Sequence, residues 1–500
     1  MSVSSEWNSL KAAWIILLLA LGARIFLSNQ FLLTPDEALY WQAEHITSFT
    51  GSDHSHVLSW LIHTSTAIFG NNEIAVRLPA ILSFTLASFY MILLGASMFS
   101  WHSALHVALL SQGILQFNMA ALIISPYSLV LTCWSAVCYH SSQAMHSNRT
   151  GDWLFAGFWF GLGLLCNFSM ILLLPFIILC FILIKPFRTC LLYPGPWFSF
   201  LLSLTIYAGI IFWVGDKFST NLINDFKIKD LVHNITPDMS YSLQFIIDQA
   251  VLVTPLVFLL ILTAWFTGTT SRHMVKADAY FLTITSFPLF LLFLIFPVFS
   301  STGIAWSAPV YITALVLIAG IHSSTRSSFK GRPKRRWILS CIVAYLVTIP
   351  LLLQIAYPVL PLPLNISQTK LMHTGWDLLG KEIDQSLQQM PDQSNTFVFS
   401  LEPGITAELA FYTPGSPQTV PLDHMTRTQH KDVLENQFQL TGKDGIGLVR
   451  TREAIERVKL LFDRVELERE LRLQSPDKGS SSAPQSFYII RCFHFTSSRS

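Results

Sequence analysis

An acidic pair beside an apolar segment is the first place in this sequence where chemistry is expected. Asp36 and Glu37 follow the apolar run 12–28. Carboxylates at a membrane edge are costly unless they are paired, hydrated or functional. Asp36 can act as a general base or, because it follows a proline and opens an amphipathic stretch, as a helix N-cap. Adjacent helical residues point in different directions, so Glu37 is either a second catalytic group or a structural carboxylate, for example one paired with Arg77.

Composition places these carboxylates in a membrane protein. The 500 residues are 52% apolar and only 12% charged, whereas soluble domains carry roughly twice that charged fraction. The shortage of charged residues ends near residue 357. This predicts a polytopic α-helical membrane domain over residues 1–357, with a first outer loop at 29–77. A small soluble α/β domain is predicted over residues 358–500. The cysteines show no metal-binding spacing.

About eleven apolar segments are long enough, or nearly so, to be transmembrane helices. They are Ala12–Ser28, Leu78–Phe99, Ala104–Ile123, Tyr127–Ser142, Trp153–Cys166, Ser169–Ile184, Pro196–Val214, Phe245–Thr267, Ala279–Phe299, Ile304–His322 and Ile338–Tyr357. Lys and Arg concentrate in alternate loops, above all in the run 326–336. By the positive-inside rule the N-terminus is cytoplasmic, and the first loop, the loop 215–244 and the C-terminal domain face outward.

The C-terminal domain is predicted from its apolar periodicity. Helices are expected at Trp376–Gln389, Ile405–Tyr412 and Arg452–Phe462. Strands are expected at Thr396–Ser400, Gly445–Val449, Val465–Leu473 and Phe487–Phe495. No phosphate-binding glycine loop is present, and no nucleic-acid partner is expected.

Several motifs together resemble a known family. They are Pro35-Asp36-Glu37-Ala38-Leu39-Tyr40-Trp41, Asp53-His54, Ala75-Val76-Arg77-Leu78-Pro79, Trp306-Ser307-Ala308-Pro309-Val310-Tyr311 and Ala407-Glu408-Leu409-Ala410-Phe411-Tyr412. The succession resembles the dolichyl-phosphate-mannose-protein mannosyltransferase family. More narrowly, it resembles the bacterial GT-C glycosyltransferases related to the lipid A aminoarabinose transferase.

The resemblance implies a transferase of the bacterial inner membrane whose C-terminal domain is periplasmic. It would move a sugar from a polyprenyl-phosphate donor to a lipid, glycan or protein hydroxyl, with membrane lipids around it. Asp36 would be the general base of an inverting displacement, since the lipid phosphate leaves as an anion and the attacking hydroxyl must lose a proton. A cation near the phosphate would stabilise the leaving charge.

Substrate-binding roles follow for several further residues. Arg77 matches the family's Arg-Leu-Pro, and His54 holds a basic position thought to face the donor phosphate. Asp53, His54 and His56 could instead hold a divalent metal, although no fourth ligand is visible, or form an ordinary interfacial loop; no cofactor is certain. Tyr40 is an interfacial aromatic or a sugar-stacking ring. Asn167 and Trp306 complete the expected substrate-binding set.

The chain also departs from the family pattern. Tyr127 and Asn167 stand where relatives commonly have an acid and a lysine, and no acid precedes Trp306. Arg24, inside the first apolar segment, either snorkels to the headgroups or compensates as a cation. The missing groups keep open a degenerate, non-catalytic binding or scaffold subunit. A lipid-linked sugar transporter is a further alternative, which predicts broken helices and charged residues within the spans.

Overall fold

A computed structural model describes most of the chain. The described residues are 3–43, 56–214, 239–269, 275–295, 307–324, 332–357, 375–422, 440–473 and 485–496. Within them, contacts divide the chain into two compact units. Unit 1 comprises residues 1–26, 52–58 and 77–352, and unit 2 comprises residues 27–51, 59–76 and 353–500. Residues from the first loop therefore share a unit with the C-terminal domain.

Within the described residues, every apolar segment predicted from the sequence is found as a helix or as a pair of consecutive helices. These elements are α1 (Val3–Ser28), α4 (Glu73–Met98), α5 (Trp101–Gly113), α6 (Leu115–Leu122), α7 (Pro126–Ser147), α8 (Thr150–Cys166), η1 (Phe168–Leu172), α9 (Leu173–Leu183), η2 (Lys185–Leu192), α10 (Pro194–Val214), α13 (Met239–Val253), α14 (Pro255–Thr267), α15 (Lys276–Ile284), α16 (Phe287–Ile295), α17 (Ala308–Ser324) and α18 (Arg332–Ala356). The fold is thus a polytopic helical one.

Several of these segments are broken. Among the described residues, four helices are long and apolar enough to cross a membrane, or up to seven if each of three bent pairs counts as one span. The pair α5 and α6 bends by 69°, and the pair α13 and α14 by 109°. At the second break Thr254 has a φ of +73° and Pro255 begins the next helix. Because proline disfavours a helical residue before it, a continuous helix cannot form there.

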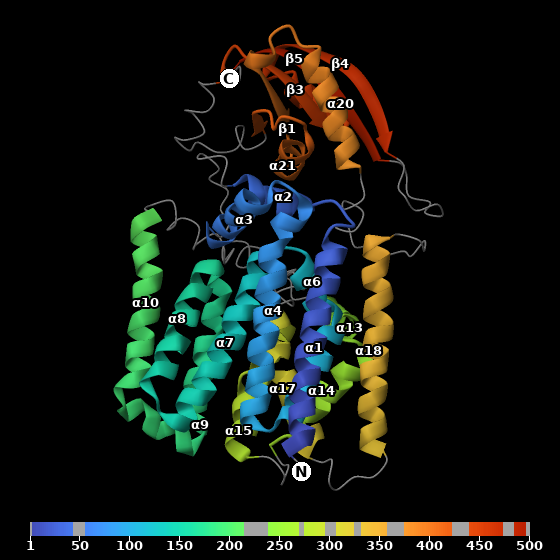
Figure 1. Cartoon of the computed structure of the whole chain (residues 1–500). Helices are drawn as coiled ribbons and strands as arrows, with labels where there is room; N and C mark the ends of the chain where they lie inside the picture. The colour runs from blue at the N-terminus through green and yellow to red at the C-terminus, as the bar shows by residue number, and fades with distance from the viewer. Residues whose placement is uncertain are drawn as a thin grey trace. The chain divides into compact units, whose positions relative to one another are not determined.

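Helix α8 packs against both α7 and α10 in unit 1, and the three run side by side (Figure 1). Gly157 and Gly161 occupy one face of α8, opposite Ser199 and Ser203 of α10. A Cβ atom added to Gly157 would lie 2.3 Å from the Ser199 carbonyl oxygen. Small residues spaced four apart allow helix backbones to approach closely in a membrane, so this spacing determines the contact between α8 and α10.

A five-stranded sheet forms the centre of unit 2. Its strands are β1 (Thr396–Ser400), β2 (Thr419–Pro421), β3 (Asp444–Val449), β4 (Phe462–Leu473) and β5 (Gln485–Phe495). Their order is β2-β1-β3-β5-β4, with β1 parallel to both its neighbours and the other pairs antiparallel. Successive β1 side chains enter different cores: Phe397 and Phe399 pack with Phe462, whereas Val398 packs with Trp376 and Ile405.

The remaining helices are α2 (Pro35–Gln42), α3 (His56–Phe69), α20 (Trp376–Gln388), α21 (Pro403–Tyr412) and α24 (Arg452–Val458). The structure differs from the sequence prediction in three respects. The predicted helix 452–462 was too long, because Phe462 begins β4 and pairs with Phe495. The three-residue strand β2 was not predicted, and the first outer loop contains the helices α2 and α3.

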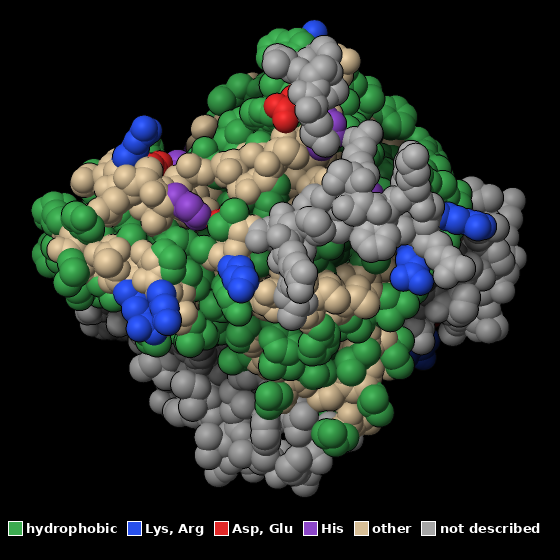
Figure 2. All heavy atoms as spheres, turned by 90° about the horizontal axis from the view of Figure 1, so that it is seen from below, with side chains coloured by type: hydrophobic (Ala, Val, Ile, Leu, Met, Phe, Trp, Pro, Cys, Tyr) green, Lys and Arg blue, Asp and Glu red, His purple; other side chains and the backbone are tan. Residues whose placement is uncertain are grey.

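Scattered basic side chains lie on one face of the molecule, among mostly hydrophobic ones. Figure 2 shows Lys and Arg side chains spread over the face seen from below, where few Asp or Glu side chains are visible. Exposed Lys and Arg residues that the sequence assigned to the inner side are Lys11, Arg149, Lys185, Arg188, Lys276, Arg335 and Arg336.

Replacing Gly157 by alanine should destabilise the contact between α8 and α10. Its Cβ would meet backbone atoms of Ser199, and overpacking of this kind costs about 1–3 kcal/mol. We expect a melting temperature several degrees lower for the detergent-solubilised Gly157→Ala protein. Gly151→Ala is the matched control, because nothing lies within 4 Å of a Cβ at that position of the same helix. Equal melting temperatures for the two variants would contradict the close-approach argument.

Candidate functional site

Helix α2 begins with a capping box that settles the structural role of the acidic pair. The Thr34 hydroxyl accepts a hydrogen bond from the Glu37 backbone N–H at 3.3 Å, and the Glu37 carboxylate accepts one from the Thr34 N–H at 2.9 Å. Pro35 occupies the first helical position, where a missing N–H costs nothing. The N-cap is therefore Thr34, so the N-cap interpretation of Asp36 is wrong, and Glu37 is a fully buried capping residue.

Asp36, at the second helical position, is left available for chemistry. Its side chain is exposed and makes no hydrogen bond or ion pair within the part of the chain that the structure describes. Although the carboxylate reaches solvent, the protein around it removes much of its water. This burial, and then the nearby Glu37 charge, raise the pKa of Asp36 above its ordinary value. A raised pKa makes the carboxylate a stronger base.

Helix α2 is held in place by α21, which lies next to it within unit 2 (Figure 1). A Cβ added to Gly404 would lie 2.7 Å from the Pro35 Cβ, so α21 closely approaches the start of α2. Trp41 meets Phe411 edge-on, with ring centroids 5.0 Å apart. The Gln42 side chain donates to the Thr419 hydroxyl at 2.6 Å. Both ends of α2 are therefore anchored to the C-terminal part of unit 2.

Tyr412 at the end of α21 joins three segments. Its hydroxyl accepts a hydrogen bond from the Leu33 N–H at 2.8 Å and donates to Glu73 at 3.0 Å. Burial, followed by the charges of Glu408 and Glu73, raises the pKa of Tyr412, so the phenol keeps the proton it donates. The sequence showed Tyr412 only as one part of a family-like segment and gave no signal that it clamps the residues before α2.

The remaining predicted residues that the structure describes are divided between the two units. Tyr40 is half-buried on α2 in unit 2. Arg77 is completely buried near the start of α4, in unit 1. Asn167, also in unit 1, accepts a hydrogen bond from the Ser169 N–H at 2.8 Å and so caps η1.

The other predicted site residues and the metal alternative cannot be examined in the described part of the chain. Asp53, His54 and Trp306 lie outside the described residues, as does the side chain of His56, which begins α3. No group of three His, Cys, Asp or Glu side chains suited to a metal is found among the residues that are described. The possible divalent-metal site on Asp53, His54 and His56 therefore stays a prediction.

Unit 1 contributes a buried cation and a cavity. The Arg24 side chain is only 2% exposed, so the snorkelling interpretation is wrong. A separate cavity of about 390 Å³ lies between α7, α8, α9, η2 and α10 and is lined by apolar side chains that include Trp153, Phe181 and Phe200. None of the predicted site residues lines this cavity.

Comparisons with known proteins define the class. Residues 53–213, about a third of the chain, match the model of the family described as dolichyl-phosphate-mannose-protein mannosyltransferase. The resemblance inferred from the motifs is confirmed, and the protein has the GT-C glycosyltransferase fold of an integral membrane protein. No curated protein matches by sequence.

Three solved structures share the fold of this chain at low sequence identity. ArnT from Cupriavidus metallidurans in the apo state matches with a TM-score of 0.63 and 12% identity, over 98% of each chain. The same protein bound to undecaprenyl phosphate matches with a TM-score of 0.62 and 13% identity, over 95% of this chain and 97% of that one. The apo Archaeoglobus fulgidus oligosaccharyltransferase matches with a TM-score of 0.52 and 11% identity, over 89% of this chain and 70% of its own.

Removing the Tyr412 hydroxyl should loosen the start of α2. Tyr412→Phe leaves the Leu33 N–H and the Glu73 carboxylate without this partner, and an unsatisfied buried group costs about 1–3 kcal/mol. We expect faster hydrogen exchange at residues 32–38, measured by mass spectrometry. Tyr193→Phe, at an exposed tyrosine of unit 1, should leave exchange at those residues unchanged. Unchanged exchange in Tyr412→Phe would show that the clamp does not order this segment.

Proposed function

We propose that the protein is an integral membrane glycosyltransferase that moves a sugar from a polyprenyl-phosphate carrier to a hydroxyl group on the outer face of the membrane. The acceptor is a lipid, a glycan or a protein. The observation that carries the proposal is the exposed Asp36 carboxylate, which has no hydrogen-bond partner among the described residues. Thr34 and Glu37 make the capping hydrogen bonds of its helix. The fold shared with ArnT, which has been solved with undecaprenyl phosphate, supports a lipid-phosphate donor.

The proposed step is a single displacement. Asp36 accepts the proton of the acceptor hydroxyl as the oxygen bonds to the anomeric carbon. The bond between that carbon and the phosphate oxygen breaks, and its electron pair leaves on the lipid phosphate. One base and a leaving group that needs no protonation suffice for attack from the opposite face, so the product is inverted. Glu37 cannot easily share this role because the capping box uses its carboxylate.

The leaving phosphate needs positive charge beside it where water is scarce. Arg77 is proposed as one such cation, since it is buried and lies in the Arg-Leu-Pro motif. His54 is proposed to donate a hydrogen bond to the same phosphate, with Tyr40, Asp53, His56, Asn167 and Trp306 around the sugar or carrier.

The lipid donor keeps its tail in the bilayer, so we place the reaction at the membrane surface. The concentration of Lys and Arg in alternate loops supports an outward-facing first loop by the positive-inside rule. The C-terminal domain is then periplasmic if the membrane is a bacterial inner membrane.

A degenerate, non-catalytic subunit is the second candidate function. It is favoured by Asn167, which caps η1 and carries no charge where relatives commonly have lysine. The bent helix pairs are a feature that transporters also show.

Replacing Asp36 by asparagine should abolish transfer. Loss of a general base lowers rates by about 10²–10⁴-fold, and we expect a fall in that range in liposomes supplied with labelled polyprenyl-phosphate sugars and a membrane extract as acceptor. Asp377→Asn is the matched control, because Asp377 is an exposed aspartate in the first turn of α20 in the same unit. Full activity in Asp36→Asn would refute the assignment, and no transfer by folded wild-type protein from any donor would favour the scaffold.

The pH dependence should follow Asp36. Because burial raises the pKa of Asp36, the transfer rate should decline as the pH falls through a pKa above that of an ordinary aspartate.

The stability of the fold should depend on pH in the opposite sense. Ionised Asp36 is disfavoured in the folded state, so the free energy of unfolding falls as the pH rises through the folded-state pKa. Asp36→Asn should therefore melt at or above the wild-type temperature at pH 7, as thermal unfolding in detergent would measure. A variant that melts several degrees lower would indicate a structural carboxylate instead.

A further inference from the structure

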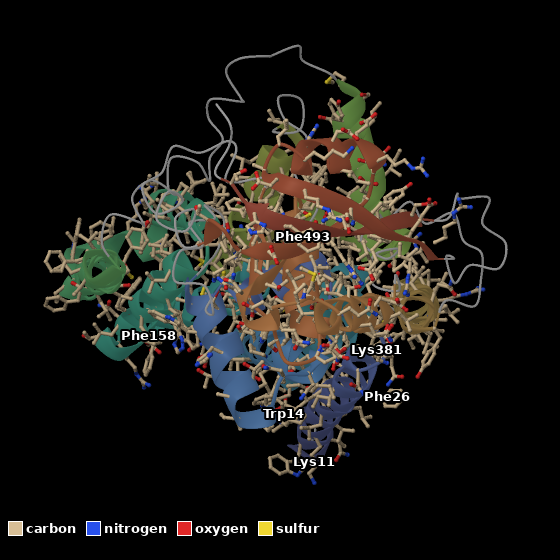
Figure 3. The ribbon with its side chains drawn as sticks, turned by 90° about the horizontal axis from the view of Figure 1, so that it is seen from above. Lys11, Trp14, Phe26, Phe158, Lys381 and Phe493 are labelled. Atoms are coloured by element: carbon tan, nitrogen blue, oxygen red, sulfur yellow. The ribbon has the colours of Figure 1, made fainter. Side chains whose placement is uncertain are left out.

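Helix α1 carries one buried arginine in an otherwise apolar segment. Arg24 lies on the same face as the buried residues Ala13 and Leu17, whereas Phe26, two positions further on, is 62% exposed. Figure 3 labels Lys11, Trp14 and Phe26 on the same helix. Because the guanidinium turns inward, lipid headgroups and bulk water do not solvate it.

The contacts of Arg24 are neutral. Its Nη2 atom donates to the side-chain oxygens of Gln112 and Asn118, the second at 2.9 Å. Its guanidinium carbon lies 4.8 Å from the centre of the Phe84 ring. The Nε and Nη1 atoms have no partner, and no carboxylate pairs with the side chain among the described residues.

The two amides are oriented toward the guanidinium by a second set of hydrogen bonds. The Gln112 amide nitrogen donates to Ser88 and Ser111 at 3.1 and 3.0 Å. The Asn118 nitrogen donates to the Gln112 and Ile114 carbonyls at 2.9 and 2.8 Å, which the break between α5 and α6 exposes. With their nitrogens engaged, both amides present their oxygens to Arg24, so the site is preformed.

A preformed cation without a counter-charge is expensive in a membrane. Buried charges persist when an anion or a full set of hydrogen bonds compensates them, and ionisable groups inside membrane segments usually have functional partners. Here two amide oxygens and one ring supply only partial negative charge, and two donor nitrogens remain. Among the described residues no anion compensates the guanidinium, so an oxyanion from outside the protein would complete the site.

We propose that Arg24 binds the phosphate group of a polyprenyl-phosphate lipid. This inference rests on the proposed function, which makes a polyprenyl-phosphate lipid the donor. A guanidinium matches phosphate oxygens well, and the apolar helix around it suits a headgroup that carries a long tail. Arg24 would thus supply positive charge that Asn167 cannot supply.

Lipid binding to the purified full-length protein tests the proposal. Native mass spectrometry would titrate wild type, Arg24→Gln and Lys11→Gln with undecaprenyl phosphate, phosphatidylglycerol and inorganic phosphate. We expect Arg24→Gln to weaken undecaprenyl phosphate binding by about tenfold or more, the effect of losing a charged hydrogen-bond donor. Lys11→Gln is the control, because Lys11 is an exposed cation of the same helix that lies 5.3 Å from the Trp7 ring; it should change binding less than twofold.

The other arms identify the source of the phosphate. Equal, Arg24-dependent binding of phosphatidylglycerol would assign the site to ordinary phospholipid, and Arg24-dependent binding of inorganic phosphate alone would assign it to a free ion. Either result overturns the proposal, as does unchanged undecaprenyl phosphate binding by folded Arg24→Gln. If Arg24→Gln does not fold, a cryo-EM map of wild type with undecaprenyl phosphate decides: phosphate density within hydrogen-bond distance of Arg24 supports the proposal, and density elsewhere refutes it.

The test separates this inference from the proposed function. Asp377→Asn should bind undecaprenyl phosphate as wild type does, because Asp377 is an exposed aspartate of α20. If Arg24→Gln binds normally while transfer still depends on Asp36, only the Arg24 assignment fails. If no transfer occurs but binding depends on Arg24, the catalytic proposal fails and the lipid-phosphate site remains.

Discussion

The capping box at the start of α2 is the interaction on which the proposed site depends. Three nearby polar residues, Thr34, Asp36 and Glu37, could each have satisfied the free backbone groups of this helix end. In the structure, Thr34 and Glu37 make the two capping hydrogen bonds. Packing against α21 fixes the direction of the helix. Asp36 is thereby held on an ordered helix without a structural partner, which is what a base needs before substrate arrives.

Two charged groups in the described chain are held at a cost to stability. The pKa of Asp36 is raised by burial and by Glu37, and Arg24 is buried against neutral partners. Charges that destabilise a fold and have no compensating partner concentrate at functional sites. The two observations come from different units and stand independently. The proposed transfer reaction has a use for each group, a base for the acceptor hydroxyl and a cation for a lipid phosphate.

The sequence predicted element types well where hydrophobic periodicity dominates. All eleven apolar segments are helical, and four strands and three helices of the C-terminal domain were expected. The break between α13 and α14 was missed although Pro255 signals it in the sequence. The break between α5 and α6, where Ile114 is extended, was not predicted because no proline marks it. The N-cap was predictable but missed: Thr34 followed three residues later by Glu37 is the capping-box pattern, and Pro35 stands at the first helical position. The inward turn of Arg24 and the clamp made by Tyr412 depend on partners 88 or more residues away.

The structure of the protein with a non-transferable phosphonate analogue of a polyprenyl-phosphate sugar would test the central claim most directly. The account predicts that the anomeric carbon of the bound analogue faces the Asp36 carboxylate across a gap that admits one hydroxyl oxygen, on the side opposite the phosphonate. An analogue bound with its anomeric carbon remote from Asp36, or facing a different carboxylate, would contradict it.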